Sequence, residues 1–250
     1  MPPYTKSLQT KSLYIMLERY AMWQLNGTEA SWIQSKWRAH YCTMHPELGL
    51  SIVHEEAPNR RIVLSLIEPT EGSPRQASEA YVRQNDLISE FAQTRQDQFS
   101  FQTYFRILPE STEWLLGLEV WLSVQTDLLD SCPSMDLVSI VPNGFWTTQS
   151  LSSSPGGDAI WLASSRDNRY TSLSVAALIH PLDAAQTMRV EGECIAEDAL
   201  QLRYFSHFME KGVIRRARMR FYLSRQEAFD VESISVLYQD FANSELPLTT

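Results

Sequence analysis

Alternation of apolar and polar side chains is the feature that most constrains this chain. Between Trp114 and Asp127 every second residue is apolar, and this set comprises Leu116, Leu118, Val120, Leu122 and Val124. A strand that points successive side chains to opposite faces of a sheet produces this period of two. Similar runs cover residues 99–107, 173–179 and 216–223. The pattern predicts long strands with one face in a core and the other in solvent.

These runs follow one another without amphipathic helices between them, which favours antiparallel sheets over repeated βαβ units. We predict an all-β, mostly antiparallel protein built as a large β-sandwich. Ser51–Glu56 and Arg60–Glu68, joined by Ala57-Pro58-Asn59, are expected to form a hairpin. Ser31–Met44 and Tyr81–Phe91 are strand candidates.

Two segments have other expectations. Leu13–Leu25 fits a strand or a helical stripe, and the strand is favoured narrowly. Ser224 and Glu227 have the spacing of a capping box, so a C-terminal helix is expected from about Arg225 to Asn243. Its apolar stripe would contain Val231, Ile234, Tyr238 and Phe241. The predicted sandwich core contains Phe101, Phe105, Leu116, Leu118, Val120, Leu122, Val175, Ile179, Met219 and Phe221.

One segment, Ser150–Asp158, has the small-residue composition of a linker. We interpret it as a loop within a single domain that covers residues 1–250. A division into two domains near residues 150–158 is the alternative.

Composition excludes several classes of protein. The 250 residues carry a formal net charge of -9, which opposes general binding to nucleic acid or to anionic membranes. Apolar runs are far shorter than the roughly 20 residues that span a bilayer. The three cysteines are widely spaced, which favours reduced thiols in a cytoplasmic protein over disulfides or a zinc site. Nucleotide-binding, serine-hydrolase and zinc-protease motifs do not occur, and we expect no cofactor and no metal.

Two histidines are candidate catalytic residues. His180 ends an apolar run, and Asp183 follows three residues later. The Asp183 carboxylate could orient the His180 ring for action as a general acid or base. His207 is the second candidate. The alternative for His180 and Asp183 is a strand end followed by a proline turn, with the carboxylate bonded to local backbone.

An arginine row is the most distinctive local feature. Alternation places Arg216, Arg218, Arg220 and Tyr222 on one face of a predicted strand. Guanidinium groups could bind phosphate, carboxylate or sugar hydroxyls, and Tyr222 could stack on a ligand. The favoured alternative is a structural row that pairs with carboxylates of a neighbouring strand, such as Glu119.

The stretch Tyr204–Arg220, together with Val124–Asp130 and Leu246–Thr249, resembles a set of uncharacterised bacterial proteins. That resemblance implies no activity, because the set has no assigned function. Long antiparallel strands with a histidine at a strand end also look like the large β-sandwich, or supersandwich, of sugar mutarotases, which is an analogy of fold alone.

The two functional hypotheses therefore come from different classes. The first is a non-catalytic binding or scaffold protein that recognises a carbohydrate or an anionic small molecule. The second is a sugar-active isomerase of mutarotase type, which would use His180 or His207 with a nearby carboxylate.

Overall fold

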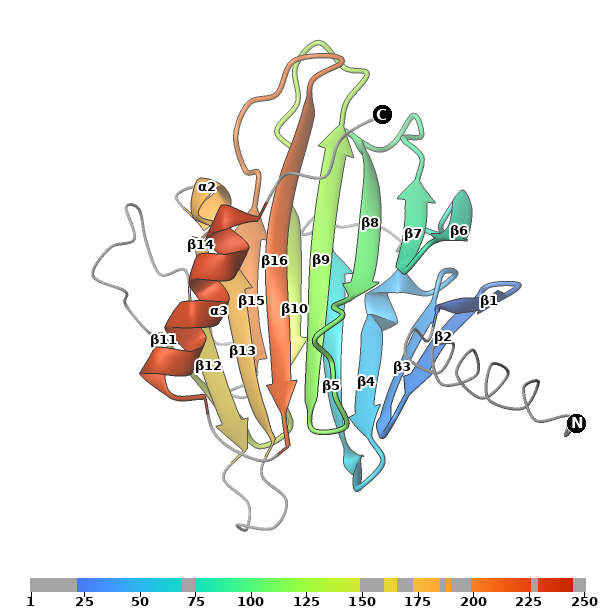
Figure 1. Cartoon of the computed structure of the whole chain (residues 1–250). Helices are drawn as coiled ribbons and strands as arrows, with labels where there is room; N and C mark the ends of the chain where they lie inside the picture. The colour runs from blue at the N-terminus through green and yellow to red at the C-terminus, as the bar shows by residue number, and fades with distance from the viewer. Residues whose placement is uncertain are drawn as a thin grey trace, which may run out of the picture.

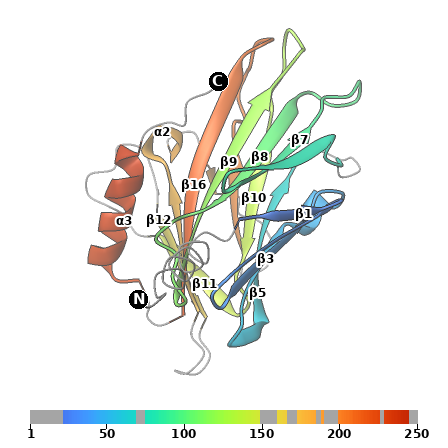
Figure 2. The same cartoon turned by 45° about the vertical axis from the view of Figure 1, so that its right-hand side comes forward.

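The computed structural model describes residues 22–68, 75–148, 160–165, 173–184, 188–189, 199–225 and 229–244. These residues form two eight-stranded sheets packed face to face, with helix α3 (Val231–Asn243) on the outside (Figures 1 and 2). Every strand pairing in the described part of the chain is antiparallel. The predicted antiparallel β-sandwich is therefore confirmed.

Sheet A contains, in spatial order, β1 (Gln24–Asn26), β2 (Glu29–Gln34), β3 (Trp37–Cys42), β4 (Leu50–His54), β5 (Ala57–Ile67), β10 (Met135–Ile140), β15 (Ala199–Tyr204) and β14 (Met188–Arg189). Sheet B contains β11 (Gly144–Thr148), β12 (Ile160–Ser165), β13 (Ser174–Ile179), β16 (Ile214–Ser224), β9 (Leu115–Gln125), β8 (Ser100–Ile107), β7 (Asp86–Phe91) and β6 (Glu79–Arg83). Two short helical turns, η1 (Pro46–Leu48) and α2 (Pro181–Ala184), complete the described elements. None of these helices is long and apolar enough to cross a membrane.

The core lies between the sheets. All ten predicted core residues are buried, with exposures between 0% and 5%. Strands β9 and β16 form the centre of sheet B and pair along their full length, from Leu115 opposite Ser224 to Gln125 opposite Ile214. Contacts between β1 and β6 and between β11 and β15 bring the edges of the two sheets together. The alternation therefore identified the correct inner face.

Two predicted strands are hairpins instead. Ser31–Met44 contains most of β2 and all of β3, and Tyr81–Phe91 contains most of β6 and all of β7. Each reversal includes a residue with positive φ, Ser35 at 52° and Gln84 at 56°. The turn at Ser35 contains no glycine or asparagine, which are the usual signals of such turns, whereas the turn at Gln84 includes Asn85.

The turn between β4 and β5 lies earlier than predicted. Ala57, Pro58 and Asn59 begin β5, and the chain reverses at Glu55–Glu56, with His54 paired to Ala57. Proline is tolerated here because it stands at the start of a strand, where a missing amide costs no central ladder bond.

Helix α3 begins later than predicted. Its N-cap is Asp230, whose carboxylate accepts a hydrogen bond from Ser233 N at 2.7 Å. Ser224 belongs to β16, so the predicted capping box is wrong. Of the predicted stripe, Ile234, Tyr238 and Phe241 are buried, whereas Val231 is 55% exposed.

Two expectations concern segments that the structure describes little or not at all. From Leu13–Leu25 only the last residues are described, and Gln24 and Leu25 belong to β1. The proposed loop or domain boundary at 150–158 lies outside the described residues.

Candidate ligand-binding face

The arginine row lies on the outer face of sheet B, which we define as the face turned away from sheet A. Its neighbours on β16, Ala217, Met219, Phe221 and Leu223, point inward and are buried. Arg216 is exposed, whereas Arg218 and Arg220 are only 3% and 8% exposed. Tyr222 is fully buried, and its hydroxyl donates to Glu110 Oε1 at 3.1 Å. A ring that stacks on a ligand must be accessible, so the burial of Tyr222 does not fit the stacking role considered for it.

Arg220 is part of a ladder of alternating charges, which we call the charge ladder: Asp86, Arg106, Glu119, Arg220 and Asp240. The strand register places Arg106 opposite both Asp86 and Glu119, and Glu119 opposite Arg220. Arg106 donates to both oxygens of Asp86 at 2.6 and 2.8 Å. Arg220 Nε donates to Glu119 Oε2 at 2.5 Å, and its Nη1 donates to Asp240 Oδ2 at 3.0 Å.

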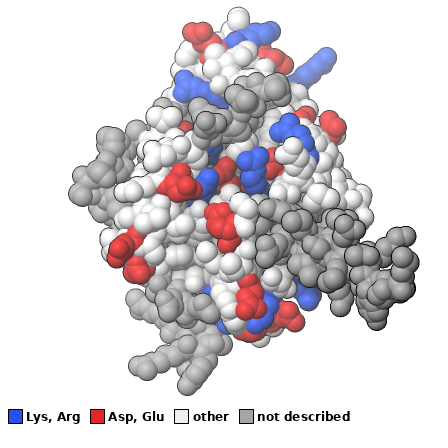
Figure 3. All heavy atoms as spheres, in the orientation of Figure 1, with Lys and Arg blue, Asp and Glu red and all other residues white. Residues whose placement is uncertain are grey.

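Helix α3 covers one end of this ladder. Asp240 and Phe241 belong to the helix, and the Arg220 guanidinium lies 4.7 Å from the centre of the Phe241 ring. In Figure 3, acidic and basic side chains alternate across the middle of this face, over α3, β16, β9 and β8. Burial opposes the charge on Arg220, but Glu119 outweighs it and raises the pKa of the guanidinium. The ladder therefore binds the helix to the sheet.

Glu119 and Arg218 are also held by local contacts. Glu119 Oε1 accepts from Trp121 Nε1 at 2.5 Å, and the carboxylate is 4% exposed. Arg218 Nη1 donates to Ser244 Oγ at 3.4 Å, at the end of α3, and its guanidinium lies 5.7 Å from the Phe241 ring centre. Arg220 is thus paired with Glu119, the partner that the structural interpretation of the arginine row named.

His180 lies at the end of β13, under α3. It is 4% exposed, and its ring meets Phe241 edge-on at 5.2 Å. Its Nδ1 accepts from Leu182 N at 3.3 Å, while Asp183 Oδ2 accepts from Arg218 N at 2.9 Å. Burial and the neighbouring Arg218 lower the pKa of His180 to about 4, and burial raises the pKa of Asp183 to about 6. The His180 ring thus bonds to local backbone, as in the turn alternative, whereas the Asp183 carboxylate bonds to the backbone of β16 and not to the local backbone that this alternative expected.

His207 lies elsewhere, in the loop after β15. Phe205 and Ser206 have positive φ values of 73° and 21°, so the strand ends at Tyr204. His207 is partly buried, and burial followed by the charge of Arg215 lowers its pKa.

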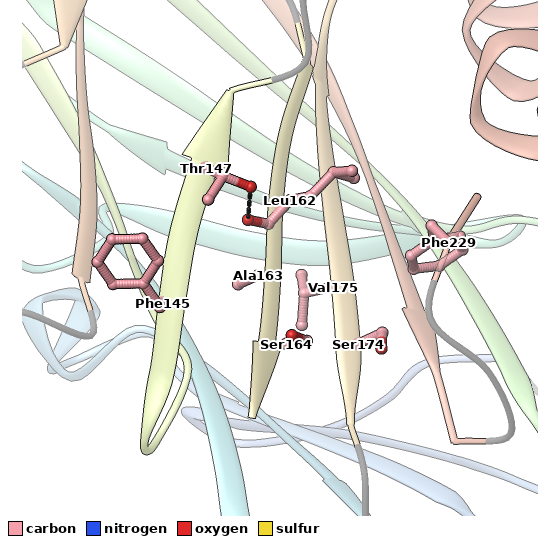
Figure 4. A pocket seen from close by; sticks show the side chains of 8 residues that line it. All are labelled: Phe145, Thr147, Leu162, Ala163, Ser164, Ser174, Val175 and Phe229. Carbon is pink, nitrogen blue, oxygen red and sulfur yellow. Dashed lines mark hydrogen bonds between the residues drawn. The ribbon is translucent and has the colours of Figure 1, made fainter. Parts of the chain in front are cut away.

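A pocket of about 300 Å³ lies on the outer face of sheet B, beside the start of α3. Its lining residues come from β11, β12, β13 and the segment before the helix, and Figure 4 shows Phe145, Thr147, Leu162, Ala163, Ser164, Ser174, Val175 and Phe229 around it. The strand register places Phe145 opposite Ser164 and Ser164 opposite Ser174, so these three side chains share a face. The volume is at the lower end of the range for small-molecule sites.

The chemistry of this pocket is neutral. Phe145, which is 54% exposed, supplies an accessible aromatic ring, and Phe229 is the second aromatic residue of the lining. Thr147 and two serines supply hydroxyls, and Thr147 Oγ1 donates to Leu162 O at 3.4 Å. None of the eight lining residues is charged. A neutral ligand with hydroxyl groups suits this lining better than an anion.

The sequence pattern places Val175 in the core and assigns none of these residues to a site. They lie on three strands and on the segment before α3, and no motif links them. The exposure of Phe145 is visible only in the structure, so the sequence offered no signal for this pocket. Groups of metal-binding side chains do not occur among the described residues.

No family model and no curated protein matches this chain, in agreement with its resemblance to proteins that have no assigned function. Among solved structures it is similar to "Putative kojibiose phosphorylase from human microbiome", with a TM-score of 0.42 and 7% identity over 91% of this chain. It is also similar to a heparinase III, with a TM-score of 0.38 and 9% identity over 82% of this chain. The chain spans about a third of the length of each, 33% and 34% respectively.

Proposed function

We propose that this protein is a non-catalytic binding protein for a neutral carbohydrate, and that the pocket beside α3 is its binding site. The observation that carries the proposal is the uncharged lining, which combines the accessible ring of Phe145 with the hydroxyls of Thr147, Ser164 and Ser174. An aromatic ring can pack against the apolar face of a sugar, while hydroxyls can both donate to and accept from sugar hydroxyls.

The charge ladder argues for a neutral ligand over an anionic one. Arg220 contacts the carboxylates of both Glu119 and Asp240, so its charge is compensated within the protein. An anion at this position would have to compete with both carboxylates. Asp240 is 73% exposed, but Glu119 is 4% exposed, and breaking that buried charged pair is unfavourable. Among the row, Arg216 is exposed, but it lies on β16, which contributes no residue to the pocket lining.

The same geometry favours binding over the isomerase alternative. His180 and His207 are both absent from the pocket lining. A pKa of about 4 keeps the His180 ring neutral at physiological pH, and its Nδ1 already accepts a backbone hydrogen bond. A general acid or base must instead reach the substrate with a proton-transferring atom.

A thermal-shift screen against neutral mono- and disaccharides, sugar phosphates and carboxylates tests this proposal, because a ligand of the native state raises apparent stability. We expect at least one neutral sugar to raise the midpoint, and titration calorimetry to confirm saturable binding. Phe145→Ala should weaken that binding at least about tenfold, the equivalent of roughly 1.4 kcal/mol.

Ile33→Ala is the matched control, because Ile33 is 59% exposed on β2 of sheet A, compared with 54% for Phe145. It should leave sugar binding unchanged. Responses confined to phosphates or carboxylates would contradict the neutral-ligand proposal. Faster interconversion of sugar anomers, measured by polarimetry, would support the isomerase instead.

A further inference from the structure

An exposed apolar cluster lies at one end of the sandwich. We call it the tip, and it consists of residues 126–134 after β9 and 205–214 between β15 and the start of β16. These two segments form the uppermost part of the molecule in Figure 1. Five large apolar side chains of the tip are exposed, namely Leu128 (42%), Leu129 (83%), Phe208 (50%), Val213 (39%) and Ile214 (51%). Clustered apolar exposure of this kind marks an interaction surface.

The two segments of the tip are joined to each other. Met209 N donates to Ser131 O at 2.8 Å, and Gly212 N donates to Thr126 O at 2.9 Å. Beneath them, Thr126 and Met209 are buried at 0% and 1% exposure. The apolar side chains are therefore held in place by a backbone framework, and a partner would not have to order these loops on binding.

Both signs of charge occur in and next to the tip. The tip itself contains three acidic residues, Asp127, Asp130 and Glu210, and the basic Lys211, and two further basic residues, Arg215 and Arg216, follow it directly on β16. In a two-fold symmetric interface the same patch meets itself, so a surface with both signs of charge can place acids opposite bases. An apolar centre with a polar rim is the usual anatomy of a protein interface.

We propose that the tip is a self-association surface, through which two copies of this chain form a two-fold dimer. The patch is small, because a standard interface takes about 20–30 residues from each partner. The dimer is therefore weak, with a dissociation constant on the order of micromolar. This proposal does not depend on the sugar site, since no tip residue lines the pocket.

A lipid surface is the alternative occupant, and the charge pattern disfavours it. Asp127 and Asp130 directly flank Leu128 and Leu129 in the sequence. Insertion of the two leucines would carry these carboxylates toward the bilayer, where a charge is costly. In a dimer the same carboxylates can face basic residues of the second copy.

Sedimentation velocity of the full chain at concentrations from about 1 to about 200 μM tests the dimer, because the extent of association depends on concentration. We expect the mean mass to rise from the monomer value toward twice that value. Leu129→Asp should weaken association at least about tenfold, without altering the circular dichroism spectrum. The matched control is Leu48→Asp, because Leu48 is 64% exposed on η1 and lies outside the tip. It should associate as the unaltered chain does.

A charge-exchange experiment tests the symmetry. Asp127→Lys with Asp130→Lys gives a tip in which basic residues predominate, and Lys211→Glu with Arg215→Glu gives a mostly acidic one. Each double variant alone should associate less than the original chain, and an equimolar mixture should recover association. A chain that stays monomeric at 200 μM, or a mixture without recovery, would overturn the proposal. So would a tip that binds phosphatidylcholine vesicles and loses that binding in Leu129→Asp while remaining monomeric.

Discussion

On its inner face β16 buries Met219, Phe221 and Leu223, whereas on its outer face the same strand buries Arg218 and Arg220. The inner side chains exchange contact with water for contact with other apolar groups, which is favourable in proportion to the apolar area that is buried. Arg220, in contrast, is buried beside Glu119 and under Phe241. Side chains on the two faces of β16 are therefore buried for two different physical reasons. The inner face stabilises the sandwich, and the outer face determines where α3 docks.

The largest expected effect is on the inner face. Phe221 is fully buried at the centre of sheet B, and Phe221→Ala removes a ring and leaves a cavity. We expect the free energy of unfolding to fall by about 4 kcal/mol, measured by urea denaturation. Val236→Ala is the control, because Val236 is 62% exposed on α3, and it should change stability by less than about 0.5 kcal/mol. A loss below about 2 kcal/mol for Phe221→Ala would mean that the sheets repack easily around the site.

The outer face is tested by two carboxylates that contact the same guanidinium. Glu119 is 4% exposed and Asp240 is 73% exposed, and both accept from Arg220. Glu119→Gln leaves a buried cation without its closest anion, so we expect a loss of about 3 kcal/mol. Asp240→Asn should cost about 0.5 kcal/mol, because exposed ion pairs contribute little. Equal losses of stability from the two variants, measured by urea denaturation, would show that depth of burial does not determine how much each ion pair of the ladder contributes.

A further test concerns the pH dependence of stability. His180 has a pKa of about 4 in the folded chain, below its ordinary value of 6.5, so the unfolded chain binds its proton more tightly. Its contribution to stability is complete above about pH 6.5 and is lost as the pH falls toward about 4. His180→Gln should reduce this acid-dependent loss, measured as unfolding midpoints between pH 7 and pH 4.5.

Asp183 acts in the opposite direction and serves as the comparison. Its pKa of about 6 lies above the ordinary 3.8, so its contribution is greatest below about pH 3.8 and is lost as the pH rises through about 6. Asp183→Asn should therefore steepen the loss of stability on acidification. Both variants shifting the profile in the same direction would contradict these assignments.

The sequence was sufficient to predict the inner face of the sandwich. Alternation in residues 114–127 identifies Leu116 to Val124 as buried, and the structure confirms each of them. An alternating pattern indicates which residues share a face, and the apolar side of a strand turns toward the core. The hairpin at Ser35 was missed because its turn has no glycine or asparagine, and the hairpin at Gln84 was missed although Asn85, a usual turn residue, follows Gln84.

The outer face of sheet B was harder to predict. Alternation correctly separates Arg218 and Arg220 from Met219, but it implies that the arginines are in solvent. Their burial depends on α3. The position of this helix follows from contacts of Arg220, which is paired with Glu119, with Asp240 and Phe241 of the helix. The pocket was missed for a similar reason, because its lining is assembled from segments that carry no common pattern.

The pairing of β9 with β16 has a consequence for biosynthesis. The chain from Gln125 to Ile214 must be made before these two strands can meet. At about 5–20 residues per second, the ribosome needs on the order of 5–20 s for that segment. During this interval the β16-facing edge of β9 has no native neighbour, and an unpaired strand edge can pair with other chains. A nascent chain halted before Ile214 is therefore the species that most needs protection by a chaperone.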